Sequence, residues 1–500
     1  MMRTSSYTIY ANLPQDQTLL IHGYTGNYDQ VSRQVATYLR SLEVKNKPQP
    51  LYGNWSLEPE LDGEVISPSQ ATIELLKRRG YLTDKTVAEE QQYLAKMAIK
   101  PELYPVNLMP SYTFMLTYNC NLRCSYCYQD HLRNNPAYKH LLKTMEPEMV
   151  DRIFAAIPQL EVSQELRKDL GLPRNIVFSG GEPLLAENYA TVEYIINKAL
   201  SLGKANFSAI TNGTELAAYQ NLLGKDKISK LQITLDGTKN EHDQRRIYPD
   251  GSGSFDKIAD NISLALSLGV QLELRVNIDR NNINQLPELA KEIIDRGWND
   301  YQSFSAVAVP ITNDKLNDLD SVKTTFSYWE LGHALETMRQ ADPNMYVINQ
   351  LDDELVAKVK QIFKQGDDPL ANLNANFCRT NNKMYAIDPL GDIYACEKKA
   401  GDAKIRIGYI AEDSKVMLNQ ELNQAWSNPT AINNSTCRQC RYAFYCGGNC
   451  AALGISNQEQ IDANYCDNFE SRFRTIVAQA YQDHVQQSGA LVKPEKVCIS

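Results

Sequence analysis

The sequence lacks any apolar run of the roughly 18 residues that a membrane-spanning helix needs. Its first residues, MMRTSSYTIYANLPQDQ, lack the continuous apolar core of a secretion signal. An excess of basic residues is also missing, because 51 Lys and Arg stand against 60 Asp and Glu and give a formal net charge of -9. Since nucleic-acid binding depends mostly on clustered cations, we expect no nucleic-acid partner, no membrane partner and a cytoplasmic location.

Cysteine is absent from the first 119 residues and again between Cys127 and Cys378. The 11 cysteines of this 500-residue chain gather mainly in two groups. Because cytosolic thiols stay reduced, the grouping indicates metal ligands and not disulfides. The gaps between the groups predict an N-terminal small α+β domain at 1–108, a core at 109–312, a helical connector at 313–377, a cysteine-rich domain at 378–470, and a C-terminal helix and tail at 471–500.

Residues 109–312 alternate apolar strand-like runs with helical patterns, which is typical of a parallel sheet with crossover helices. Helical spacing predicts one helix before Gly203 and another that begins at Ser254, as N-cap, and ends before Gly269. The predicted strands are 112–118, 175–179, 206–211, 230–235, 270–278 and 303–309. These units predict an α/β fold with a partial (β/α)6 barrel, whose active site lies at the strand C-termini.

The segment TYNCNLRCSYCYQD places Cys120, Cys124 and Cys127 on one loop after the first predicted strand. Three thiolates at this spacing can bind a 4Fe-4S cluster and leave its fourth iron open to a small chelating molecule. A zinc loop and a closed ferredoxin-type cluster are the alternatives. Each needs a fourth ligand that this region does not obviously provide.

The segment NIVFSGGEPLL places Gly180, Gly181, Glu182 and Pro183 after the second predicted strand. Glycines let a ligand approach the backbone closely, and a carboxylate beside them can pair with an ammonium group. A simple turn explains the tetrapeptide alone equally well.

The CxxxCxxC loop, with Tyr126 before its last cysteine, resembles the signature of the radical S-adenosylmethionine (SAM) superfamily. The resemblance implies that the open iron chelates the methionine part of SAM. Reduction would then cleave SAM to a 5'-deoxyadenosyl radical, which removes a hydrogen atom from the substrate. GGEP, one β/α unit later, matches the SAM amino-group site of the superfamily.

Two further strand ends, TNG at 211–213 and TLDGxxxxHDxxR from Thr234, resemble segments of peptide-modifying members of the superfamily. The resemblance implies that their polar groups contact the SAM ribose and carboxylate. The residues concerned are Thr211, Asn212, Thr234, Asp236 and Arg246. Loop capping and a solvated ion pair are the alternatives. His242 has no second histidine nearby, so we do not expect it to bind a metal.

The later cysteines are similar throughout to the SPASM module, a C-terminal extension of peptide-modifying radical SAM enzymes. Its interleaved pattern implies two auxiliary iron-sulfur clusters of the 4Fe-4S type. One would be bound by Cys437, Cys440, Cys446 and Cys466, and the other by Cys378, Cys396 and Cys450. Structural zinc on Cys437, Cys440, Cys446 and Cys450 is the alternative. A predicted hairpin of 384–387 and 392–395 would bring Cys378 and Cys396 together.

The second of these clusters has only three cysteine ligands. The stretch before Cys378 offers Asn372, Asn374 and Asn376 where some relatives have a fourth cysteine. An open iron that binds substrate, a non-cysteine ligand and a smaller cluster are the alternatives. Cys498 is expected to be a free thiol on a frayed tail.

Residues 17–45 predict a hairpin followed by a helix, and helices are also predicted at 69–79 and 87–98, the latter with a capping box from Thr86 to Glu89. The segment resembles, weakly, the peptide-recognition elements of maturases of ribosomally made peptides, in which a leader peptide adds a strand to a sheet edge. A structural cap on the barrel is the alternative. A proline-containing linker at 45–67 would let such a domain move.

Together these features predict a radical SAM/SPASM peptide maturase that takes hydrogen from a residue of a precursor peptide and forms a cross-link or another oxidised product. The expected partners are the precursor peptide, through its leader, and an electron donor such as flavodoxin or ferredoxin.

The first alternative is an anaerobic sulfatase-maturating enzyme. That family typically has an Asp after the cysteine of a GxxxxC motif, whereas here Glu397 follows Cys396 and is the candidate catalytic base. The second alternative is a non-catalytic iron-sulfur electron-transfer or binding protein, which would need neither an open iron nor a SAM site.

Overall fold

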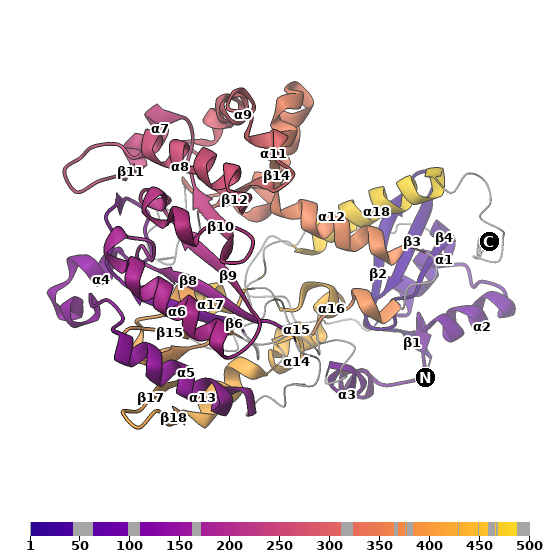
Figure 1. Cartoon of the computed structure of the whole chain (residues 1–500). Helices are drawn as coiled ribbons and strands as arrows, with labels where there is room; N and C mark the ends of the chain where they lie inside the picture. Colours follow the sequence, from indigo (N-terminus) through magenta and orange to yellow (C-terminus); the bar gives the residue numbers. More distant parts are fainter. Residues whose placement is uncertain are drawn as a thin grey trace. The chain divides into compact units, whose positions relative to one another are not determined.

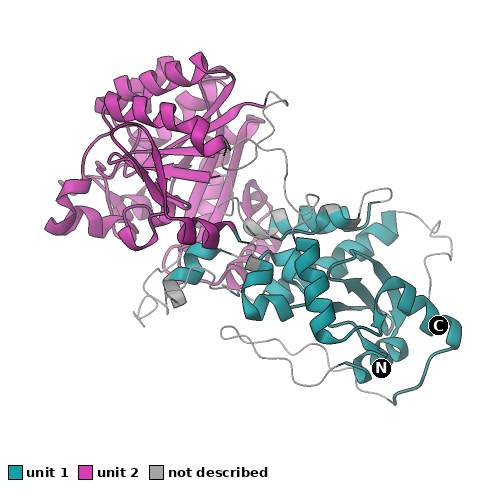
Figure 2. Cartoon of the chain, turned by 90° about the horizontal axis from the view of Figure 1, so that it is seen from below, with its two compact units in different colours: residues 1–106, 352–378, 428–500 teal, residues 107–351, 379–427 magenta. Residues whose placement is uncertain are grey.

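The computed structural model describes residues 2–43, 64–98, 111–162, 172–311, 324–364, 369–375, 377, 384–428, 430–448, 450–458, 466 and 469–487. The chain forms two compact units, shown in two colours in Figure 2. Unit 1 comprises residues 1–106, 352–378 and 428–500, and unit 2 comprises residues 107–351 and 379–427. The five domains expected from the cysteine gaps stay a prediction, and these units group the same segments differently.

A row of six parallel strands forms the middle of unit 2, in the spatial order β13-β12-β10-β9-β8-β6. Their bounds are β6 (Ser111–Thr117), β8 (Arg174–Gly180), β9 (Ala205–Thr211), β10 (Ile228–Thr234), β12 (Gln271–Ile278) and β13 (Phe304–Pro310). All six predicted strands are confirmed, each within two residues of its expected bounds. The parallel α/β architecture of a partial barrel is therefore confirmed, with the strand C-termini along one edge.

Helices connect these strands and bury their apolar faces against the sheet (Figure 1). They are α5 (Pro147–Val162), α6 (Tyr189–Ser201), α7 (Lys239–Arg245), α8 (Phe255–Ser267) and α9 (Leu286–Asp295), and the 3-10 segment η5 (Leu216–Leu222) follows β9. Ser254 is the N-cap residue of α8, as predicted, but the expected side-chain bond is absent. Ser254 makes no capping bond, because its hydroxyl donates to the Arg246 carbonyl, and the Asp243 carboxylate accepts the Phe255 N–H instead.

The sheet continues beyond the six strands to a total of eleven. β14 (Ile348–Gln350) pairs with β13, and β15 (Met384–Ile387) pairs in parallel with β6. β16 (Asp392–Tyr394), β17 (Gly408–Ile410) and β18 (Val416–Leu418) then follow antiparallel. The β15–β16 hairpin confirms the one predicted from the sequence. Cys378 lies outside the described residues, so its approach to Cys396 stays a prediction.

The remaining elements of unit 2 are short or peripheral. They are β7 (Arg123–Cys124), β11 (Arg246–Ile247), α4 (Asp130–Asn134), α11 (Tyr328–Ala341), α13 (Gln420–Ser427) and the 3-10 segments η2 (Pro136–Leu141), η4 (Ala186–Asn188), η6 (Ile283–Gln285), η7 (Trp298–Asp300), η8 (Pro343–Val347), η11 (Glu397–Lys399) and η12 (Ala403–Ile405).

Unit 1 contains a three-stranded antiparallel sheet of β2 (Thr8–Leu13), β3 (Gln17–His22) and β4 (Tyr28–Ser32). One face packs on α1 (Arg33–Ser41) and α2 (Gln70–Arg79), through residues that include Leu20 and Leu76. The other face packs on α12 (Leu351–Ile362) and α18 (Phe469–Gln487), through residues that include Ile21 and Val477. The predicted hairpin and the helix after it are confirmed, and helices cover both faces of the sheet.

The cysteine-rich C-terminal helices share a core with the N-terminal segment. Leu94 of α3 (Val87–Ala98) packs with Ala431 and Phe444, and the Tyr7 hydroxyl donates to the Arg438 carbonyl over 2.5 Å. The predicted capping box of α3 is confirmed by bonds in both directions between Thr86 and Glu89. The other elements of unit 1 are β1 (Arg3–Thr4), β5 (Leu82–Thr83), η9 (Pro369–Asn372), α14 (Thr430–Asn433), α15 (Ser435–Gln439), α16 (Ala443–Cys446) and α17 (Ala451–Gln458).

Within the described ranges, none of the helices combines the length and the apolar character that crossing a bilayer requires.

Candidate active site

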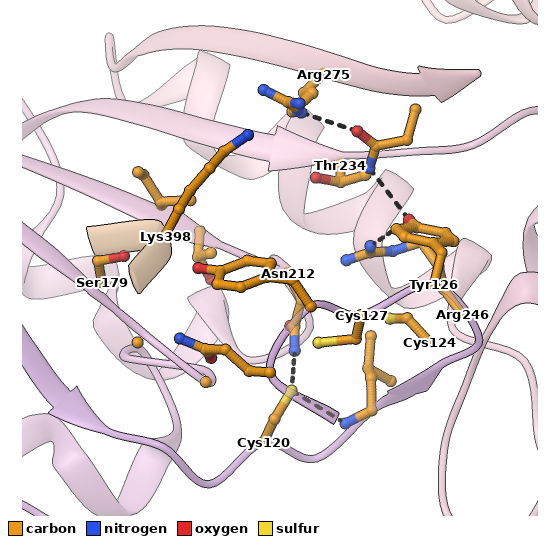
Figure 3. Close-up of a pocket in the computed structure, with 18 of the residues that line it drawn as sticks. Cys120, Cys124, Tyr126, Cys127, Ser179, Asn212, Thr234, Arg246, Arg275 and Lys398 are labelled. Atoms are coloured by element: carbon orange, nitrogen blue, oxygen red, sulfur yellow. Dashed lines mark hydrogen bonds between the residues drawn. The ribbon is translucent and has the colours of Figure 1, made fainter. Parts of the chain in front are cut away.

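A cavity of about 240 Å³ opens at the C-terminal ends of the parallel strands in unit 2 (Figure 3). The three cysteines of the first loop line it, together with side chains from β8, β9, β10 and β12 and from the loop after Cys396. The polar and charged lining residues are Cys120, Cys124, Tyr126, Cys127, Tyr128, Gln129, Arg133, Ser179, Thr211, Asn212, Gln232, Thr234, Arg246, Arg275, Asn277, Glu397 and Lys398.

N–H groups of the protein point at the sulfur atoms of the cysteine loop. The Leu122 amide donates to Cys120 Sγ over 3.4 Å, and Asn212 Nδ2 lies 3.7 Å from the same sulfur. Arg133 Nη2 donates to Cys127 Sγ over 3.1 Å. Because N–H donors stabilise thiolates, this environment suits cysteines that bind an iron-sulfur cluster.

The segment after α7 holds the cysteine loop in place through its backbone. β11 pairs antiparallel with β7, so that Arg246 lies opposite Cys124. The Ser125 amide donates to the Arg245 carbonyl over 3.2 Å. The HDxxR segment and the CxxxCxxC loop are therefore two sides of one small ladder.

The Tyr126 hydroxyl connects this ladder to the sheet. It donates to Asp236 Oδ2 over 2.5 Å and accepts from Arg246 Nη1 and Asn277 Nδ2 over 2.8 and 3.1 Å. Burial raises the pKa of Tyr126 well above its ordinary value, although the Arg246 guanidinium acts in the other direction. Asp236 does not line the cavity, and its carboxylate positions Tyr126.

His242 is part of the same scaffold. Its Nδ1 accepts from the Asp236 amide over 3.3 Å, and its Nε2 lies 3.0 Å from Ser254 Oγ, which itself donates to the Arg246 carbonyl. These partners fit a neutral imidazole with the proton on Nε2. Burial lowers the pKa of His242 well below its ordinary value, helped by Arg246 and Arg245.

The GGEP segment brings its backbone close to the cysteine loop. A Cβ atom at Gly180 or Gly181 would collide with the carbonyl oxygen of Thr117 or Asn119. Gly180 also has a φ of +131°, which favours glycine. Both glycines line the cavity, whereas Glu182 and Pro183 do not.

Glu182 braces the neighbouring strand end instead of facing the cavity. Its carboxylate accepts from Thr211 Oγ1, the Asn212 amide and the Leu184 amide over 2.6, 2.5 and 2.9 Å. Burial raises the pKa of Glu182 to about 7, and these three bonds act to lower it. The described structure thus gives this carboxylate a supporting position, whereas the sequence suggested direct contact with an ammonium group.

Several lining residues have no place in the sequence motifs, and four of them are Arg133, Arg275, Asn277 and Lys398. Arg275 Nε donates to Asn277 Oδ1 over 2.8 Å. In Figure 3, Ser179, Arg275 and Lys398 lie on the side of the cavity away from the cysteines. A signal for two of them was present, because Arg275 and Asn277 alternate with buried apolar residues along a predicted strand.

Glu397 lines the cavity and directly follows the buried Cys396. It makes a side-chain hydrogen bond with Ser179 at the end of β8. Burial raises the pKa of the Glu397 carboxyl, and Lys398, the Ser179 bond and Arg275 act to lower it. A carboxyl group in this position can accept a proton from a molecule in the cavity.

Four C-terminal cysteines are neighbours in unit 1. Burial raises the pKa of the Cys437 thiol well above its ordinary value, and Cys446, Cys440 and Cys466 act on it in the same direction. Burial raises the pKa of Cys440 to about 12, with a further contribution from Cys466. The four residues that the SPASM pattern assigns to one cluster therefore lie within electrostatic range of one another.

Across the described residues, no three His, Cys, Asp or Glu side chains converge closely enough to hold a metal ion. Cluster binding by either group of cysteines is accordingly a prediction that rests on their donor chemistry. For the first loop that chemistry fits, since three thiols line one cavity, receive N–H donors and lie beside two buried Arg133 nitrogens that lack a hydrogen-bond partner.

Comparison with known proteins identifies this site. Residues 114–293 match the family model of the radical SAM superfamily. These residues form a radical SAM domain. The matched residues contain the cysteine loop, GGEP and the segment from Thr234 to Arg246, so the motifs of the radical SAM domain line or support the cavity. The superfamily uses SAM and a 4Fe-4S cluster.

Two curated relatives of this chain are maturases. The cysteine-type anaerobic sulfatase-maturating enzyme of Clostridium novyi (strain NT) is 25% identical over 396 residues, which cover 73% of this chain and 96% of the relative. Mycofactocin maturase MftC of Mycolicibacterium smegmatis is 25% identical over 355 residues, covering 68% of this chain and 77% of the relative.

The radical SAM fold is also found in a solved structure, native anSMEcpe with bound AdoMet. It superposes with a TM-score of 0.57 at 16% identity and covers 76% of this chain and 100% of the other. At that identity the likeness shows the fold and nothing more.

Proposed function

We propose that this enzyme is a radical SAM/SPASM peptide maturase that removes hydrogen from a residue of a ribosomally made precursor peptide. The observation that carries the proposal is the cavity itself. Its lining joins the three-cysteine loop to Glu397, and Glu397 lies one residue from Cys396, a proposed auxiliary-cluster ligand. A radical source, a base and an electron acceptor would thus meet at one substrate site.

Cys120, Cys124 and Cys127 would bind the SAM-binding 4Fe-4S cluster, which together with SAM supplies hydrogen-atom abstraction. Gly180 and Gly181 would let the SAM amino group approach the backbone. Side chains that line the cavity would contact the rest of SAM, and these are Tyr126, Thr211, Asn212, Thr234 and Arg246. Glu182, Pro183 and Asp236 support them from outside the cavity.

The opposite side of the cavity would hold the peptide. Glu397 is the proposed catalytic base, because Ser179 orients its carboxyl group and burial raises its pKa towards that of a useful proton acceptor. Arg275 and Lys398 are cations that act electrostatically on Glu397. They would favour the ionised carboxylate from which a proton can be taken up.

Removing a hydrogen atom and then a second electron from a peptide requires an oxidant near the substrate, and auxiliary clusters would supply it. The mutual proximity of Cys437, Cys440, Cys446 and Cys466 supports one such cluster. Cys378, Cys396 and Cys450 would bind the other, with its fourth iron open or bound by a residue other than cysteine. A flavodoxin or ferredoxin would supply the electron that starts the reaction.

The sheet of unit 1 would bind the leader of the precursor peptide at an edge. Helices cover both of its faces, so only its edges are available for another strand. Arg441 Nη1 donates to the Thr8 carbonyl of β2 over 2.5 Å and thereby occupies part of that edge. β4 is the other outer strand among the residues that the structure describes. Arg79 Nη2 donates to its Tyr28 carbonyl over 2.9 Å, so the proposed leader site is the β4 edge beyond Tyr28.

Formation of formylglycine in a sulfatase is the second candidate function. The sulfatase-maturating relative aligns over 96% of its own length, and Glu397 lines the cavity directly after Cys396, where that family has an Asp. An N-terminal segment that includes the β2–β4 sheet favours the precursor-peptide function over this alternative.

A peptide assay tests the proposal. The anaerobically reconstituted enzyme, SAM and dithionite are incubated with short peptides encoded beside its gene and, separately, with a sulfatase-type peptide that contains the target cysteine. We expect 5'-deoxyadenosine and a loss of two hydrogen atoms from a precursor peptide, both read by mass spectrometry. Conversion of the sulfatase peptide alone would establish the second function. SAM cleavage with neither peptide changed would overturn both peptide functions.

A further inference from the structure

Arg133 is a buried cation beside the cysteine loop that no motif explains. It lies six residues after Cys127, in α4, and only 4% of its side chain is exposed. Its Nη2 donates to Cys127 Sγ over 3.1 Å. Neither its Nε nor its Nη1 has a hydrogen-bond partner among the described residues, although both atoms are buried at the cavity.

The surroundings of Arg133 contain little negative charge other than the thiolate that Cys127 would carry as a cluster ligand. Its one acidic contact among the described residues is Asp130, whose carboxylate lies 3.8 Å from Nη2 and is 42% exposed. Water screens an exposed carboxylate much more than a buried group. The positive charge of Arg133 therefore acts mainly on Cys127 and on whatever that sulfur binds.

We propose that Arg133 is a positioning residue that raises the reduction potential of the cluster bound by Cys120, Cys124 and Cys127, through its charge-assisted hydrogen bond to the Cys127 sulfur. Gaining one electron makes the cluster more negative by one charge. A buried cation that donates to one of its thiolates stabilises this reduced form more than the oxidised form. The two remaining donors of Arg133 are available to an acceptor on the bound group.

Two other arginines near the cysteine loop bind groups other than sulfur. Arg123 Nη1 donates to the carbonyls of Cys120 and Leu122 over 2.7 and 2.9 Å, so it supports the backbone. Arg246 donates to Tyr126 and not to a sulfur. Among the described arginines of the cavity, the direct bond to a cysteine sulfur belongs to Arg133.

A redox titration followed by electron paramagnetic resonance tests the proposal in the full-length enzyme, with dithionite as reductant and without SAM. The relevant signal is the one that disappears when Cys120, Cys124 and Cys127 are all replaced by Ala. Arg133→Met should lower the midpoint potential of this signal by at least about 59 mV. For one electron, this shift corresponds to a tenfold loss in the equilibrium constant for reduction. Arg133→Lys should retain most of the wild-type midpoint, and Arg133→Gln should fall between the two.

Two controls separate the hydrogen bond from general charge and from misfolding. Lys139→Met removes an exposed positive charge from the same segment and should leave the midpoint unchanged. Asp130→Asn removes the exposed carboxylate, which water screens, so its midpoint should shift much less than that of Arg133→Met. A wild-type midpoint in a fully loaded Arg133→Met enzyme would overturn the proposal, as would an equal shift in Lys139→Met. If Arg133→Met does not load iron, a wild-type midpoint in Arg133→Gln overturns it.

Discussion

The Tyr126 hydroxyl links several residues at the cavity through hydrogen bonds. Asp236 accepts from it, while Arg246 and Asn277 donate to it. Asp236 therefore influences the cavity by fixing the Tyr126 phenol. Glu182 supports its neighbours in a similar way, because its carboxylate accepts from Thr211 and from two backbone amides.

The sequence motifs identified residues that a bound cluster requires at a fixed spacing, such as Cys120, Cys124 and Cys127. They did not reveal Arg133, which reaches Cys127 from the following helix, or Lys398, which lies next to Glu397 in the 3-10 segment η11. A single charged residue in a loop or short helix has no periodicity that distinguishes it from a solvated surface charge. Only the folded arrangement of the loop shows which of these charges line the cavity.

Glu397→Gln tests the proposed base. The variant retains the size of the side chain and its capacity to bond to Ser179, but it cannot accept a proton. We expect formation of the oxidised peptide to fall by about 10²–10⁴-fold, whereas SAM cleavage continues. Mass spectrometry measures both products, and Glu412→Gln, at an exposed site, is the matched control. A proportional loss of SAM cleavage would assign Glu397 to cofactor binding and not to proton transfer.

The strands and helices of the core were predictable because each of the six parallel strands has apolar residues in a run or at alternate positions, and each long crossover helix shows a buried stripe. The extension of the sheet was not predictable. β15 pairs with β6 from Met384 to Ser111, and no local pattern specifies a partner at such a separation. The missing capping bond of Ser254 has a similar cause, since its hydroxyl bonds to the Arg246 carbonyl and the Asp243 carboxylate accepts the Phe255 amide instead.

The β3 hairpin of unit 1 carries a buried histidine that links its stability to pH. His22 Nδ1 accepts from the Thr25 amide over 3.3 Å, and its Nε2 lies 3.1 Å from Ser5 Oγ, which donates to Glu90. Burial lowers the pKa of His22 from 6.5 to about 4, although Glu90 and the Gly80 backbone act to raise it and Lys85 lowers it further. The folded state therefore requires the neutral ring.

Because the folded pKa lies below the unfolded one, the contribution of His22 to stability is complete above pH 6.5 and is lost as the pH falls towards 4. The free energy of unfolding should decrease over that window by about 3 kcal/mol at most. Urea denaturation followed by circular dichroism at pH 7 and pH 5 measures the loss. His22→Asn, whose side-chain oxygen can still accept from Thr25, should show a smaller loss, and the exposed His131→Asn should behave like wild type. Equal losses in wild type and His22→Asn would exclude this histidine as the cause.

The two ends of the chain form one folded unit. The β2–β4 sheet contributes to a core with α18, and α3 contributes to another with the cysteine-rich helices. Arg441, between two of the proposed cluster ligands, binds the Thr8 carbonyl and the Glu43 carboxylate. A cluster on Cys437, Cys440, Cys446 and Cys466 would therefore stabilise the N-terminal sheet, in addition to any electron-transfer role.

Iron content distinguishes the proposed assignment of these cysteines to iron-sulfur clusters from a zinc site. With three 4Fe-4S clusters, the reconstituted enzyme should contain about 12 irons, and loss of one cluster should remove about four. Cys466→Ala and Cys437→Ala should each remove one cluster, and their combination should remove no more than either alone, since both residues serve the same cluster. Combining Cys466→Ala with Cys450→Ala should remove about eight, because Cys450 is assigned to the other cluster. Cys498→Ala is the control and should retain all the iron. If Cys450→Ala and Cys437→Ala instead release a single zinc ion and leave the iron unchanged, the four-cysteine zinc site is correct and the assignment of Cys466 is wrong.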